Sequence, residues 1–164
     1  MITDIQKAIA GEKLDGWHFF NFLHRDPLSD RILGLDTERI NSRPWYYLVP
    51  AKGNPIRICH AVEPNHLNDL SGEKIIYSSR EQLIKALEEA VSHIGSNWGA
   101  QFSAELTTVS TLDYGTALML EKCGMLSVIS DPLDDGLTDV AKGKRQDLQD
   151  LIYGIMDGNE PDTA

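Results

Sequence analysis

The sequence predicts an α/β fold, a three-layer α/β/α sandwich built around a mixed sheet. Segments with helical periodicity alternate with strand-like segments over most of the chain. Two adjacent strand-like segments are separated only by a short Gly-containing turn, which predicts a hairpin. The first strand-like run, 16–23, is almost continuously apolar, as in a strand covered on both faces. A hairpin within an alternating pattern implies a mixed sheet with helices on both faces.

The first third of the chain predicts a helix, a strand and a second helix. Residues 3–11 place their apolar side chains on one helical face, and Gly11 is a stop signal. The strand over 16–23 follows. After a polar turn, Ser29 is positioned to cap a short helix that continues through Leu35.

The middle of the chain contains the hairpin and a capped helix. Strands over 45–49 and 56–62 are rich in aromatic and β-branched residues, and a short strand over 74–77 comes next. Ser79 and Gln82 have the spacing of a capping box, which predicts a helix that ends before Gly95.

The last part predicts two strands and two helices. A strand over 98–102 precedes a helix over 111–122, for which Thr111 is the expected cap. A strand over 125–129 and an amphipathic helix over 142–156 complete the pattern.

The excess negative charge is concentrated near the C-terminus. The chain of 164 residues has 25 acidic and 15 basic side chains, a formal charge of -10, and residues 131–164 contain nine of the acidic and three of the basic ones. We therefore expect a domain over 1–133 and an acidic segment over 134–164, with a linker over 131–141, a helix and a frayed tail over 157–164. This charge argues against binding to nucleic acid or to an anionic membrane, which need excess Lys and Arg.

Cysteine usage and hydropathy indicate a cytoplasmic, soluble protein. Cys59 and Cys123 lie in apolar segments and are expected to be buried small hydrophobes rather than a disulfide or a nucleophile. The N-terminus lacks a basic region followed by an apolar stretch, and no window approaches the length of a membrane span.

The sequence predicts no catalytic residue and no metal ligand in this chain. None of its histidine pairs has the spacing of a helical metal site, and phosphate-loop and nucleophile-elbow motifs do not occur. His18 and His24 are expected to be polar residues at the edge of a strand. A mixed three-layer sheet is also typical of ribonuclease-H-like nucleases, but these hold two metals on carboxylates of the sheet, where only Asp15 occurs.

The hairpin offers the best candidates for a binding surface. Arg43, Pro44 and Trp45 form its most suggestive triplet, because Arg and Trp are the anchors that interfaces use most. His60 lies near the end of the second hairpin strand, where a binding role is open.

A set of short motifs extends over roughly residues 13–133. The most specific is a Ser-x-x-Asp-x-Gly-Thr helix entry at Ser110–Thr116. The others, in order, are Leu14–Phe22, Arg31–Leu35, Arg43–Gly53, Ile58–Glu63, Leu70–Lys74, Tyr77–Ser79, Phe102–Ser103, Gly124 and Ser130–Leu133. Their order and spacing resemble the N-terminal domain of the creatinase, prolidase and aminopeptidase P family of "pita-bread" metallopeptidases. The segment between Ser103 and Ser110 is shorter than in the family and lacks its proline.

The resemblance implies a ribonuclease-H-like motif and a non-catalytic role. In the family, a C-terminal domain holds two divalent, manganese-like metals that activate a hydroxide against an Xaa-Pro bond, and no position of this chain matches those ligands. The family's N-terminal domain forms one wall of the substrate site and mediates dimer or tetramer contacts. The implied partners are a second copy of the chain, a catalytic domain in cis or in trans, and proline-containing peptides. Arg43, Trp45 and His60 are then the interface or substrate-wall candidates.

Two alternatives remain open from the sequence. The chain could be a stand-alone binding or assembly module without peptidase activity, which its acidic C-terminal segment motivates. It could also belong to a relative with different chemistry, because enzymes of the family hydrolyse creatine or act as lyases.

Overall fold

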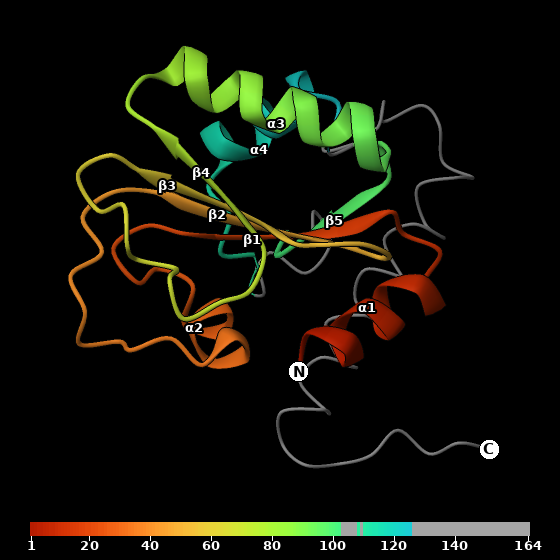
Figure 1. Ribbon diagram of the computed structural model, residues 1–164, viewed down its shortest axis with the longest axis horizontal. Helices are drawn as coiled ribbons and strands as arrows, with labels where there is room; N and C mark the ends of the chain where they lie inside the picture. Colours follow the sequence, from red (N-terminus) through yellow and green to blue (C-terminus); the bar gives the residue numbers. More distant parts are fainter. Residues whose placement is uncertain (103–107, 109, 126–164) are drawn as a thin grey trace.

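The computed structural model describes residues 1–102, 108 and 110–125, and Figure 1 shows their arrangement. The elements are α1 (Ile2–Gly11), β1 (Gly16–Asn21), α2 (Pro27–Leu33), β2 (Trp45–Pro50), β3 (Ile56–His60), β4 (Glu73–Tyr77), α3 (Arg80–Ile94), β5 (Trp98–Ala100) and α4 (Tyr114–Lys122). The predicted strand over 125–129 lies almost wholly outside the described residues. The linker, the last helix, the tail and the domain boundary at 133 lie outside them entirely.

The strands form one mixed sheet with helices on both faces, as the sequence predicts. The strand order is β4-β3-β2-β1-β5. β2 is antiparallel to β1 and β3, whereas β4 is parallel to β3 and β5 is parallel to β1. α3 and α4 cover one face, and α1 and α2 cover the other (Figure 1). The structure is therefore a three-layer α/β/α sandwich, and the predicted hairpin is confirmed as β2 and β3.

The two central strands contribute to both cores, because successive side chains of a strand point to opposite faces. Every residue of β1 and β2 is buried. Phe20 and Tyr46 pack in the core beneath α3 and α4. Trp17, Trp45 and Tyr47 pack in the core against α1 and α2. This two-sided burial explains why the first strand is an almost continuous apolar run.

Two tryptophans lock β1 against the edge strand β5. In the parallel register, Gly16 pairs with Trp98, and Trp17 pairs with Gly99. A Cβ atom on either glycine would overlap the indole ring of its partner. The rings lie on opposite faces of the sheet, Trp98 in one core and Trp17 in the other. Each glycine is thus required for the close approach of a large side chain across the strand pair.

Two helices begin at residues other than the predicted caps. The N-cap of α2 is Asp26, whose Oδ1 accepts hydrogen bonds from the amides of Leu28 and Ser29. The Ser29 side chain instead donates to Asp26. α4 begins after Asp113, which accepts from the Thr116 amide, and the predicted cap Thr111 lies outside the helix. In both places a carboxylate within reach of free helix amides replaces a hydroxyl.

Several strands are shorter than predicted. β1 ends at Asn21 rather than at residue 23, because Leu23 has a positive φ of 55° and His24 one of 52°. Such backbone angles cannot continue a strand. β3 ends at His60 and β5 at Ala100, each two residues earlier than expected.

His18 is a buried residue and not the polar strand-edge residue that the sequence suggests. Its side chain is 2% exposed and packs beside the rings of Phe20 and Tyr46. Neither ring nitrogen has a hydrogen-bond partner among the described residues. Burial lowers the pKa of His18 to about 3, so the imidazole is neutral. Cys59 and Cys123 are free and buried, as predicted.

Within the described part of the chain, no helix has the length and apolar character needed to cross a membrane.

The Trp–Gly pairs make a direct prediction about stability. Gly99→Ala forces the Cβ atom into the buried Trp17 ring and should lower the free energy of unfolding by about 1–3 kcal/mol, the usual cost of overpacking a core. Urea denaturation measures this change. Gly11→Ala, at the end of α1, is the matched control, because no atom lies within 4 Å of the added Cβ, and it should not lower stability, since Ala is favoured over Gly in a helix. Equal stabilities of the two variants would contradict this packing.

Candidate functional site

The loops of one end of the sheet form the candidate site. β2 is antiparallel to both of its neighbours, and β4 and β5 are parallel to β3 and β1, so β1, β3, β4 and β5 all run in the same direction. The carboxyl ends of these four strands therefore lie at the end of the sheet where the candidate site is found. Ligands of open α/β sheets bind in the crevice outside the carboxyl ends of the strands. Two of the connections at this end are the wall loop (residues 34–44), between α2 and β2, and the crossover loop (residues 61–72), between β3 and β4.

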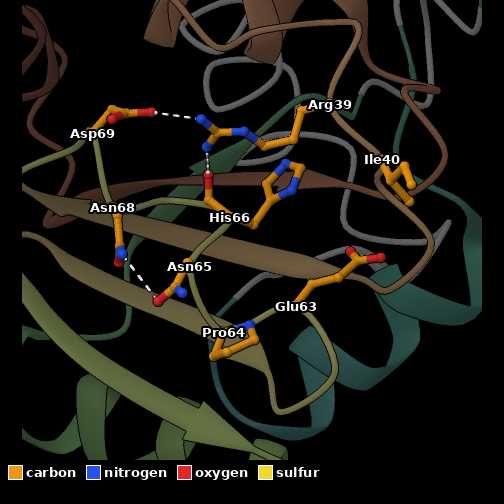
Figure 2. Close-up of a pocket in the computed structure, with 8 residues that line it drawn as sticks. All are labelled: Arg39, Ile40, Glu63, Pro64, Asn65, His66, Asn68 and Asp69. Carbon is orange, nitrogen blue, oxygen red and sulfur yellow. Dashed lines mark hydrogen bonds and ion pairs between the residues drawn. The ribbon is translucent and has the colours of Figure 1, made fainter.

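A pocket of about 390 Å³ lies between the wall loop and the crossover loop. All of its lining residues come from these two loops, and Figure 2 shows them. They are Arg39, Ile40, Glu63, Pro64, Asn65, His66, Asn68 and Asp69. The lining thus combines charged groups, amides and an imidazole with two apolar side chains.

Arg39 joins the two loops across the pocket. Its Nη1 donates to the carbonyl oxygen of His66 at 2.9 Å, and its Nη2 contacts Asp69 Oδ2 at 3.1 Å. The ion pair is exposed and contributes little by itself, but the bond to the carbonyl fixes the crossover loop where His66 enters the pocket.

Glu63 makes a second link between the loops. Its carboxylate accepts hydrogen bonds from the Ser42 amide at 2.9 Å, from the Ser42 hydroxyl and from the Arg43 amide at 3.3 Å. Burial raises the pKa of Glu63, but these hydrogen bonds outweigh burial and lower the pKa below its ordinary value. Glu63 is therefore a carboxylate at neutral pH.

His66 is the most enclosed polar side chain of the pocket. It is 5% exposed, and its ring stacks on Trp45 with 6.0 Å between centroids and 25° between planes. In Figure 2 the ring points into the space between Ile40 and Glu63. Burial lowers the pKa of His66, so the imidazole is neutral at physiological pH and can accept one hydrogen bond and donate another. The ring has no hydrogen-bond partner among the described residues.

The lining of the pocket offers hydrogen-bonding groups and apolar surface to a small molecule. No group of three or more His, Cys, Asp or Glu side chains within the residues that the structure describes could hold a metal ion. The chemistry available is hydrogen bonding from the imidazole and the amides beside an apolar wall.

The three sequence-predicted site residues lie at this end of the sheet but do not line the pocket. Arg43 is exposed and its guanidinium donates to the Ser42 carbonyl at 2.9 Å. Trp45 is buried beneath His66 and supports it. His60 lies toward the opposite face, where its ring contacts Tyr77 edge-on at 5.0 Å and its Nδ1 accepts from the Val62 amide.

Sequence reasoning missed Arg39, Glu63 and His66. The run Glu63–His66 is polar and follows a predicted strand, a pattern that indicates a loop or a short turn of helix and no particular site. A usable signal exists in that segment: two parallel strands require a crossover connection, and such a connection leaves from the carboxyl end of the sheet, where ligands bind. The strand directions were needed to apply that rule.

Comparison with solved structures relates this fold to a peptidase. The crystal structure of the prolidase from Pyrococcus horikoshii is similar to this chain with a TM-score of 0.51 and 18% sequence identity. The similarity covers 75% of this chain and 29% of that prolidase chain. No protein-family model and no curated protein matches the sequence. The chain therefore has a prolidase-like α/β fold, and at this identity the likeness concerns the fold alone.

The Glu63 contacts predict a pH-dependent contribution to stability. Because the folded-state pKa is lowered, the contribution is fully present above about pH 4.5 and is lost as pH falls through the folded-state pKa. Glu63→Gln should lower the free energy of unfolding by about 0.5–1 kcal/mol at neutral pH, since the site is partly exposed. The difference from the wild type should shrink in acid, as urea denaturation at several pH values would show. Glu38→Gln, in the wall loop, is the control and should change neither the stability at neutral pH nor its dependence on pH.

Proposed function

We propose that this chain serves as a non-catalytic domain of a prolidase-like peptidase, of the N-terminal type, which shapes substrate access and mediates oligomer contacts. The observation that carries the proposal is the fold likeness, which extends over most of this chain but less than a third of the prolidase chain. Hydrolysis would then depend on a catalytic domain, in cis or in trans, that holds two manganese-like metals. We expect the assembly to be cytoplasmic.

The loops at the carboxyl ends of the strands would form the wall of the substrate site. They present a pocket in which Ile40 and Pro64 offer apolar surface beside the neutral imidazole of His66. Such a surface suits a short peptide that has an apolar ring and few charges, and proline-containing peptides meet that description. The exposed Arg43, with Trp45 and His60 nearby, stays the candidate contact to a second copy or to substrate.

A stand-alone binding module is the second candidate function, and the pocket favours it. The stacked His66 and its flanking carboxylate and guanidinium are held in place by contacts within the chain. A preformed pocket of this kind binds a small ligand without help from another domain.

Two measurements test the proposed domain role. The purified chain should not cleave Xaa-Pro dipeptides, with or without added manganese, and light scattering should show a dimer or larger species. Manganese-dependent cleavage that follows the chain through purification would contradict the non-catalytic role. A strict monomer at high concentration would contradict the oligomer contacts. Saturable NMR shifts around His66 with a dipeptide, absent in His66→Ala, would show that this pocket binds a peptide without a catalytic domain.

A further inference from the structure

His24 connects the loop after β1 to both α2 and the wall loop. Its Nδ1 lies 2.8 Å from Asp30 Oδ2, and its Nε2 lies 2.8 Å from the carbonyl oxygen of Arg39. The adjacent amide of Leu23 donates to the carbonyl of Asn41 at 3.1 Å. His24 and Leu23 both have a positive φ, which is unfavourable for residues other than glycine. The contacts of the wall loop thus hold a backbone that would otherwise relax.

The two hydrogen-bond partners of His24 determine how many protons the His24–Asp30 pair must carry. A carbonyl oxygen only accepts hydrogen bonds, and so does an ionised carboxylate. A neutral imidazole carries one N–H and can satisfy only one of them. Both 2.8 Å contacts therefore need one additional proton, either on the His24 ring or on the Asp30 carboxyl group.

The surroundings of the pair keep that proton in place. Asp30 is 1% exposed, and its Oδ1 has no hydrogen-bond partner among the described residues. Asp36 of the wall loop adds negative charge near His24, Arg39 meets His24 through its carbonyl, and His66 interacts electrostatically with both His24 and Asp30. Burial lowers the pKa of His24, but the hydrogen bonds to Asp30 and to the Arg39 carbonyl outweigh burial and raise the pKa above its usual value.

We infer that the proton shared by His24 and Asp30 is a latch on the wall loop, and that its loss releases Arg39 and opens the pocket. The connection is direct, because Arg39 accepts from His24 through its carbonyl and holds the crossover loop through its guanidinium. The 77% exposed Ile40, which lines the pocket, follows Arg39 in the chain and would move with it. This inference concerns the pocket itself and does not depend on the proposed peptidase role.

The direction of the pH effect follows from the raised pKa. The latch is fully closed below about pH 6.5, where a released histidine would also be protonated. It weakens as pH rises through the pKa of the latched His24. With one linked proton, opening increases by at most about tenfold for each pH unit in that window.

Trypsin cleavage after Arg39 reports the latch, because the scissile carbonyl is the one that accepts from His24. Cleavage of the full chain is followed by mass spectrometry from about pH 6 to about pH 9, where histidine titrates. Each rate is divided by the rate for a free peptide of residues 36–43, which removes the pH dependence of the protease. The wild-type ratio should rise with pH.

Asp30→Asn keeps both hydrogen bonds of His24 but removes the need for the additional proton. The carboxamide can donate to Nδ1 of a neutral His24, whose Nε2–H still donates to Arg39, so the ratio should stay low and independent of pH. His24→Gln removes the titrating group and should give a high ratio at every pH, which tests the latch if Asp30→Asn does not fold. The exposed His93→Gln in α3 should keep the wild-type profile. A flat wild-type profile, or a rise in Asp30→Asn or His24→Gln equal to that of the wild type, would overturn the latch.

Discussion

The antiparallel pair β1–β2 must be covered on both faces, and the positions of the other elements follow from that constraint. Its side chains alternate between two cores, so helices are needed above and below the sheet. The reciprocal stacking of Trp17 on Gly99 and of Trp98 on Gly16 then fixes the register of the edge strand on both faces at once. A slip by one residue would drive both indoles into side chains or solvent.

The same constraint explains the unusual crossover loop. The connection between β3 and β4 contains no helix. Its Leu67 and Leu70 nevertheless cover part of the core that packs against α1 and α2. A loop that packs on a core needs partners for its backbone carbonyls. Arg57 donates to the carbonyls of Gly72 and Leu67, and the Tyr47 hydroxyl donates to that of Ser71. Arg39 donates to the carbonyl of His66, and the pocket lies where this loop meets the wall loop.

The sequence was sufficient to predict the fold because its signals are local. Aromatic and β-branched runs mark the strands, and the Ser79 cap accepts from the Gln82 amide as the capping pattern requires. The starts of α2 and α4 were misplaced because a hydroxyl and a carboxylate close in sequence compete for the same helix amides, and geometry decides between them. His18 was misjudged because alternation predicts which face a side chain takes, but not how completely that face is covered.

The pocket was not predictable for a different reason, since its contacts join loops that are distant in the chain. Arg39 reaches His66 across 27 positions, and Ser42 reaches Glu63 across 21. Neither pairing has a periodic signature, and both depend on strand directions that only the folded sheet defines. The same distinction applies to the likeness to a prolidase. At 18% identity the buried residues that define the fold can be similar while the loop residues that form a pocket differ, so the likeness concerns the fold and not the function.

The pairing of the pocket's charged groups limits what it can bind. Arg39 is occupied by Asp69 and a carbonyl, and Glu63 by Ser42 and Arg43, so neither charge is available without breaking a contact that shapes the pocket. The neutral ring of His66 and the side-chain amides of Asn65 and Asn68 are uncharged polar groups that line the same pocket. A ligand that relied on a strong ionic contact would therefore open the pocket it enters. An uncharged or weakly charged molecule, bonded to His66 and packed on Ile40 and Pro64, leaves both loops in place.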